Sequence, residues 1–196
     1  MRVMQQQKYV MAIAGIVMLF YLVFHMLSNL SFFSREDFTD FYQWYNHLIV
    51  RGSLLSLFLA ALLLHVWVAF KIRRVNAKAR IIDYQRHAGF HIPPLFVTLS
   101  ITFLLLFIVL HIVQTLQFDT DKVYQETIAL FHSGWMVLLY LAGLFVLTMH
   151  LQHALANVLQ TLGKTAKTCQ LLALGVALII TGGLAVIPLY SYLILI

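Results

Sequence analysis

Charged side chains are scarce in this chain of 196 residues. Only 10% of the residues are Asp, Glu, Lys or Arg, whereas 62% are hydrophobic and the mean hydropathy is +0.88. A soluble core of this size cannot hide so much apolar surface from water. The composition therefore excludes an ordinary soluble domain and predicts an integral membrane protein.

The sequence also lacks the cysteines and the intramembrane acidic residues that several kinds of functional site would need. The single cysteine, Cys169, permits no internal disulfide, and no Cys-x-x-Cys-His motif offers covalent haem attachment. The apolar runs contain no rows of Asp, Glu or Arg that would mark an ion or voltage pathway. Two of the three prolines are adjacent, at Pro93 and Pro94, and they suit a helix start because the missing N–H does no harm there.

Long apolar runs dominate what is present. A run of about 20 residues crosses the hydrocarbon layer as a helix, because backbone groups in lipid have no water to bond. Five runs qualify, at residues 9–31, 51–72, 93–117, 130–156 and 170–193. We expect an all-α membrane protein with one domain over residues 1–196, an up-and-down bundle of five transmembrane helices. The aromatic and polar segment 32–50 predicts a surface helix at the membrane interface.

Lys and Arg are distributed unequally between the two sets of helix ends. Ten of the thirteen are on the side of the N-terminus, whereas six of the seven acids are on the other side. The positive-inside rule therefore predicts a cytoplasmic N-terminus and an external C-terminus, in the cytoplasmic membrane of a prokaryote. The net charge of +6 is this topological signal, so it gives no reason to expect nucleic-acid binding.

Five of the nine histidines lie well inside the predicted spans, away from the helix ends, where ionisable side chains are costly and are candidates for function. At about 1.5 Å per residue, His25 and His111 lie about 24 and 27 Å from the inner helix ends, near the outer face. His65 lies about 21 Å from Arg51 and His150 about 27 Å from His132, both counted from the outer side, so these two lie toward the inner face. The fifth, His153, is close to His150. Four helices thus supply two histidine pairs at two levels.

Two facing imidazoles suit a six-coordinate haem b, because the porphyrin supplies four nitrogens and each histidine supplies one axial nitrogen. A zinc site would need three or four ligands at one depth. A structural histidine bonded to a neighbouring helix is the alternative for any single member, but four at matched levels argue against it. Lys71 and Arg73, one to two turns beyond His65, are candidates for contacts with the haem propionates.

Four segments around these histidines carry a family resemblance. They are LVFHMLSNL at 22–30, LLLHVWVAF at 62–70 followed by NAKAR at 76–80, IVLHIVQT at 108–115, and HLQHALANVLQTLG at 150–163. In this order they resemble the five-helix, di-haem cytochrome b membrane anchor of succinate:quinone oxidoreductases, which include succinate dehydrogenases and quinol:fumarate reductases. The resemblance covers nearly the whole chain.

The resemblance implies a role for each histidine pair. His25 and His111 would be the axial iron ligands of the outer, distal haem b, and His65 and His150 those of the inner, proximal haem b. It also implies two cytoplasmic partners, a flavoprotein with FAD and a subunit with three iron–sulfur clusters, which dock on the basic inner face. The chain itself would pass electrons to or from membrane quinone, and the dicarboxylate site would lie on the flavoprotein.

The quinone site implied by the family lies beside the distal haem and is usually associated with menaquinone. Asn29, His47 and His132 are the candidates for this site. The alternative is that they are polar residues at the membrane interface that only contact lipid headgroups. Some fumarate-reducing members have a glutamate two residues before the fourth-helix ligand, His150, which serves proton movement. Thr148 holds that position in this chain, so the resemblance does not extend to that proton route.

The signature favours His150 as a ligand over His153, which lies about 60° around the helix and could not easily bind the same iron. We expect His153 beside the haem site or a facing helix. Two other functions stay open. One is the cytochrome b subunit of a hydrogenase or formate dehydrogenase, although the basic inner face argues against its external partner. The other is a haem-free anchor or metal-binding transporter that uses histidines.

Overall fold

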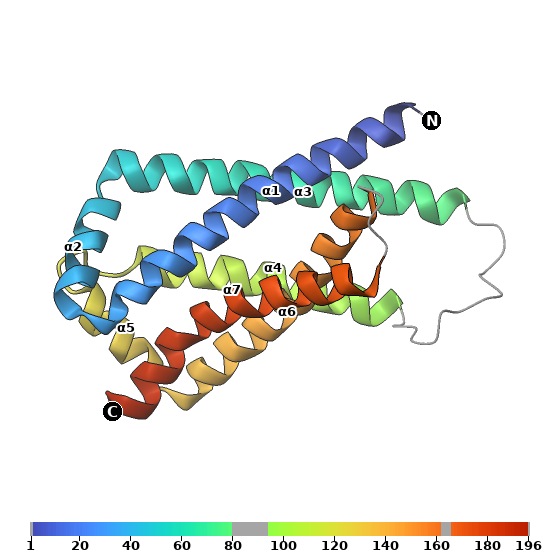
Figure 1. Cartoon of the computed structure of the whole chain (residues 1–196). Helices are drawn as coiled ribbons and strands as arrows, with labels where there is room; N and C mark the ends of the chain where they lie inside the picture. Colours follow the sequence, from blue (N-terminus) through green and yellow to red (C-terminus); the bar gives the residue numbers. More distant parts are fainter. Residues whose placement is uncertain (1, 80–93, 162–165, 196) are drawn as a thin grey trace. The chain divides into compact units, whose positions relative to one another are not determined.

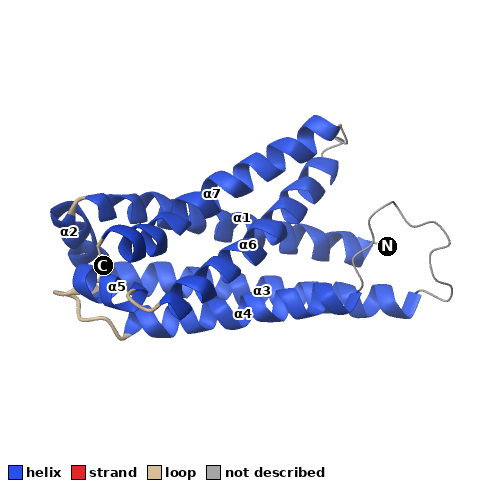
Figure 2. Ribbon diagram, turned by 90° about the horizontal axis from the view of Figure 1, so that it is seen from below, coloured by secondary structure: helices blue, strands red, loops and turns tan. Residues whose placement is uncertain are grey.

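The computed structural model describes residues 2–79, 94–161 and 166–195 (Figure 1). Within these ranges every regular element is a helix, as Figure 2 shows. Five helices are long and apolar enough to cross a membrane: α1 (Arg2–Asn29), α3 (Leu48–Ala79), α4 (Pro94–Leu116), α6 (Gly134–Thr161) and α7 (Lys167–Ile194). They confirm the predicted all-α fold with five spans.

The five predicted spans overlap the five long helices, but α1 begins seven residues earlier than predicted, and α3 and α6 end seven and five residues later. Helix α4 begins at Pro94, as expected for a proline in a first turn. The predicted helix 130–156 is wrong at its start, because residues 130–131 end a separate helix, α5 (Val123–Phe131), and α6 begins at Gly134. The backbone N–H of His132 closes α5 on Ile128, and the Ser133 carbonyl starts α6. The predicted span thus took in the last two residues of α5, which was not predicted as a separate helix.

Short helices connect the spans. The helix α2 (Arg35–Tyr45) confirms a helix within the segment 32–50 and follows the 3-10 turn η1 (Leu30–Phe33), while its place at the membrane interface stays a prediction. The Ser34 hydroxyl caps α2 by accepting the backbone N–H of Asp37 at 3.2 Å. Phe32 and Phe38 are buried, and they join a cluster with residues of α5, α6 and α7. This aromatic cluster fixes the short helices against the ends of the long ones.

The chain divides into two units, residues 1–23 with 48–93, and residues 24–47 with 94–196. In the first unit α1 contacts α3, for example through Tyr21 and Phe58, whose ring centroids are 4.7 Å apart. In the second unit α6 and α7 run side by side (Figure 1). A hydrogen bond of 2.8 Å between Thr148 and Thr181 joins these two helices.

Candidate functional site

His25 on α1 and His111 on α4 lie next to each other in the second unit. Their ring centroids are 5.8 Å apart and the ring planes make an angle of 62°. Two metal–imidazole bonds of about 2 Å each, with the two half-rings, would place the centroids about 6 Å apart. The two predicted outer histidines are therefore brought together.

A hydrogen-bond chain fixes the protonation of the His111 ring. His111 Nδ1 lies 3.2 Å from the Tyr140 hydroxyl, and that hydroxyl donates to Gln114 Oε1 at 2.9 Å. A hydroxyl has one proton, so the Tyr140 oxygen must accept from His111 Nδ1–H. The lone pair of the neutral ring is then on Nε2, the nitrogen that can bind a metal.

Aromatic side chains enclose the His111 ring. Phe107 is stacked at 6.4 Å with an angle of 25° between ring planes, and Phe107 and Tyr140 meet edge to face at 5.2 Å. Gly143 on α6 makes room for Phe107, because a Cβ at this position would lie 2.6 Å from the nearest atom of the ring. The glycine thus allows the Phe107 ring to lie against the α6 backbone.

His65 on α3 belongs to the first unit and has a similar constraint. Its Nδ1 lies 3.2 Å from the Met11 carbonyl oxygen on α1. A carbonyl can only accept, so Nδ1 carries the proton and Nε2 the lone pair. Gly15 lies beside the ring, where a Cβ would be 3.7 Å from Nδ1. His65 is therefore held against α1 in the tautomer that a metal ligand bonded through Nε2 requires.

His150 is half-buried on α6, in the second unit. It lies ten residues beyond Tyr140, which is about 15 Å along the helix axis. Because Tyr140 contacts His111, His150 is at a different level from the His25–His111 pair, as the depth count predicts. Its pairing with His65, which belongs to the other unit, stays a prediction.

His153 is exposed on α6. Its Nε2 lies 3.0 Å from the Asn157 side-chain nitrogen, one turn later on the same helix. Its predicted place beside a haem stays a prediction. The Thr148 hydroxyl lies 2.8 Å from both the Leu144 carbonyl oxygen and the Thr181 hydroxyl oxygen, and its single proton is shared between these two acceptors. Thr148 therefore serves the packing of α6 against α7.

Asn29, the first quinone candidate, ends α1 one turn after His25. Its Oδ1 accepts a hydrogen bond of 2.8 Å from the Tyr42 hydroxyl on α2. Burial raises the pKa of Tyr42, so the phenol stays a neutral donor. The Phe38 ring lies 4.5 Å from the Tyr42 ring. A polar pair with an aromatic neighbour thus lies close to the histidine pair.

The other two quinone candidates are less enclosed. His47 follows α2 and is exposed, and His132 is an exposed residue at the end of α5. The propionate candidates Lys71 and Arg73 are exposed near the C-terminal end of α3. The Lys71 ammonium lies 5.1 Å from the centre of the Trp67 ring. The assigned roles of these four residues stay predictions.

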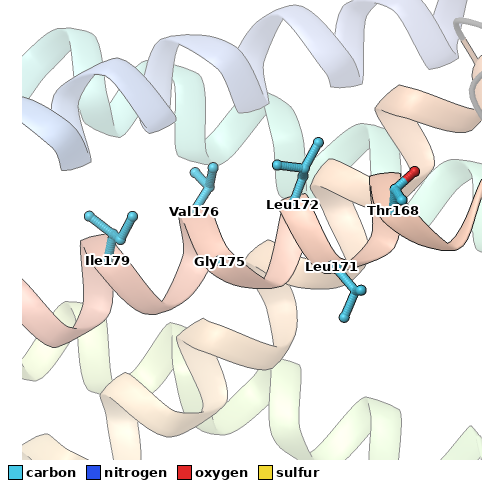
Figure 3. A pocket seen from close by; sticks show the side chains of 6 residues that line it. All are labelled: Thr168, Leu171, Leu172, Gly175, Val176 and Ile179. Carbon is cyan, nitrogen blue, oxygen red and sulfur yellow. The ribbon is translucent and has the colours of Figure 1, made fainter.

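One apolar groove lies on α7, with a volume of about 500 Å³. It is lined by Thr168, Leu171, Leu172, Gly175, Val176 and Ile179. Figure 3 shows that its side chains are apolar except for the Thr168 hydroxyl. None of the candidate ligands lines it. Within the described ranges, no group of three or more His, Cys, Asp or Glu could hold a metal ion.

Sequence reasoning missed the residues that support the histidines. Tyr140 and Gln114 are polar residues inside apolar helices, and Gln114 lies three residues after His111 in the motif at 108–115. That spacing puts both on one helix face and was the available signal.

No family model matches the chain, and neither does any curated protein or solved structure.

Proposed function

We propose that this chain is the membrane anchor and electron-transfer subunit of a succinate:quinone oxidoreductase. One haem b would be held by His25 and His111 and a second by His65 and His150. Its partners would be a flavoprotein subunit with FAD and a subunit with three iron–sulfur clusters, with menaquinone as the expected membrane substrate. The observation that carries the proposal is the 5.8 Å separation of the His25 and His111 rings inside a membrane-spanning bundle.

The chemistry of the donors fits a bis-histidine haem. Histidines that ligate metals usually donate their other ring N–H to a carbonyl, carboxylate or similar acceptor. His111 does so to Tyr140 and His65 does so to the Met11 carbonyl, and both rings therefore carry the lone pair on Nε2. Neutral imidazoles also avoid the cost of burying charge in the membrane. A bound haem iron would alternate between ferric and ferrous states and carry one electron at a time.

The ends of the bundle suit the proposed partners. Lys71, Arg73 and Arg74 are exposed at the end of α3, on the predicted cytoplasmic side, where they can meet propionates or an acidic protein surface. At the C-terminal end of α1, the Asn29–Tyr42 pair and the neighbouring Phe38 ring offer a hydrogen-bonding group and an aromatic surface to a quinone head. The proposed orientation has the N-terminus in the cytoplasm.

Haem content is the first test. We expect pyridine haemochrome analysis of the complex, purified from membranes through this chain, to give two protohaems per chain. Covalent flavin and iron–sulfur clusters should copurify on cytoplasmic partners. Absence of haem would overturn the proposal. A haem-containing complex with an external hydrogenase or formate dehydrogenase partner would show instead that the chain is the cytochrome b subunit of such an enzyme.

The pairing of the ligands is tested by four single variants. His25→Ala and His111→Ala should each remove the same component of the reduced-minus-oxidised spectrum. His65→Ala and His150→Ala should each remove the other component. If His25→Ala and His65→Ala abolished one and the same component, the proposed pairing would be wrong even though haem was present.

A further inference from the structure

Tyr140 is placed to control the His111 ring. We infer that Tyr140 is a positioning residue that keeps the His111 proton on Nδ1. The lone pair of His111 is then on Nε2, facing the iron, and the hydrogen bond to Tyr140 makes this imidazole a more basic ligand. The inference rests on the proposed function, because it assumes a haem iron between His25 and His111. It adds the hydrogen-bond chain from His111 through Tyr140 to Gln114, which links α4 to α6.

The donor and acceptor roles in these hydrogen bonds follow from the orientation of the Gln114 side-chain amide. The Gln114 amide nitrogen faces Met136 Sδ at 3.6 Å, so its oxygen faces Tyr140. This oxygen takes the phenolic proton at 2.9 Å, and the phenol oxygen is left as an acceptor for His111 at 3.2 Å. A reversed chain would require the amide oxygen to face the sulfur atom, which is only a weak acceptor.

The hydroxyl is held in place by packing. Tyr140 is 7% exposed, and its ring meets Phe131 at 4.8 Å and Phe107 at 5.2 Å, both edge to face. These contacts on two sides restrict the rotation of the Tyr140 ring. The hydroxyl therefore presents its oxygen to His111 at a fixed position.

An acceptor on Nδ1–H increases the basicity of a metal-bound imidazole. A more basic ligand favours ferric over ferrous iron, because it donates more charge to the more positive ion. Loss of the Tyr140 hydroxyl should therefore raise the midpoint potential of the haem bound to His111. It should also weaken haem binding there, since loss of such a partner costs about 10-fold to 100-fold in metal affinity.

The test is Tyr140→Phe in the intact complex. This variant keeps the ring and both edge-to-face contacts and removes only the hydroxyl. We expect an upward shift in the midpoint potential of the component that His111→Ala removes, and no shift in the other component. For one electron, a tenfold change in the preference for ferric iron is about 59 mV.

Two further variants test whether a shift in potential depends on the hydrogen bond to His111 or follows from the loss of any tyrosine hydroxyl. Tyr190→Phe removes a hydroxyl on α7, whose ring contacts Phe32 and Phe33 instead of His111, and it should leave both potentials unchanged. Gln114→Leu removes the acceptor of the phenolic proton and should give a smaller upward shift than Tyr140→Phe. Selective loss of the His111-dependent haem in Tyr140→Phe, with a shifted potential in Gln114→Leu, would also support the inference.

The outcomes distinguish the inference from the proposed function. Two haems with unchanged potentials in Tyr140→Phe would overturn the inference and leave the proposed function standing. An equal shift in Tyr190→Phe would do the same, because the effect would then not depend on the bond to His111. Wild-type protein without haem would overturn both.

Discussion

Gly143 is the position where the packing around His111 leaves least room. A Cβ added there would lie 2.6 Å from Phe107 Cδ1 and 2.7 Å from Cε1 and Cγ. Contacts this short force a rearrangement, and a rigid ring whose first atom is involved cannot move aside as the end of a flexible side chain can. We therefore predict that Gly143→Ala destabilises the protein and disturbs the surroundings of His111.

The magnitude can be worked out against a matched glycine. Forcing a methyl group into a packed core costs about 1–3 kcal/mol. Any glycine-to-alanine change within a helix gains up to about 1 kcal/mol of helix propensity, which offsets part of that cost. Gly182 on α7 has no atom within 4 Å of its added Cβ, so Gly182→Ala keeps the gain without the clash. The two variants should therefore differ by about 1–3 kcal/mol, with Gly143→Ala the less stable.

Thermal unfolding of the detergent-purified protein measures this difference. For a chain of this size, 1 kcal/mol corresponds to about 2–4 °C, so the Tm values should differ by about 2–12 °C. The Phe107→Leu background provides the decisive control, because a smaller, more flexible side chain should reduce the cost of Gly143→Ala. Equal Tm values for the two alanine variants, or an undiminished cost in the Phe107→Leu background, would refute the reasoning.

Two further predictions concern residues near the proposed haem sites. His153→Ala should keep both haems, because His153 is exposed and bonds to Asn157 on its own helix; haemochrome analysis showing one haem would contradict this. Burial raises the pKa of Tyr42 above its ordinary value of 10.0, so the folded protein holds this proton more tightly than the unfolded chain. The stabilisation is complete below about pH 10 and is lost as the pH rises further, so Tm should fall more steeply there in the wild type than in Tyr42→Phe. Parallel alkaline melting curves would argue against it.

The transmembrane helices could be predicted from the sequence because lipid itself imposes them. A backbone in hydrocarbon must bond within its own helix, so apolar runs of sufficient length become helices whatever they pack against. The same argument does not hold in the connections, where water competes for the backbone. There α2 was predicted from its interfacial aromatic residues, whereas α5 was not predicted, and only its last two residues fell within the predicted span 130–156.

The shared level of His25 and His111 could be predicted because a fixed rise per residue converts residue number into depth. That count placed His25 and His111 at one level, and their rings do lie 5.8 Å apart. Depth does not give rotation about the helix axis, however. The spanning helices are apolar on all sides, so no polar face indicates which residues point inward. The contact between Tyr140 and His111 depends on that rotation and became visible only in the structure.

His65 and His111 reach the same protonation by different means, and the difference bears on how the proposed haems could be tuned. The acceptor for His65 is a backbone carbonyl of α1, which no substitution at Met11 removes. The acceptor for His111 is a side-chain hydroxyl, which a single substitution at Tyr140 removes. The potential of a haem bound to His65 would therefore be tied to the helix itself, whereas that of a haem bound to His111 could change with one side chain. If both haems are present, substitution of Tyr140 should shift the midpoint potential of the His111-dependent haem far more than substitution of Met11 shifts that of the His65-dependent haem.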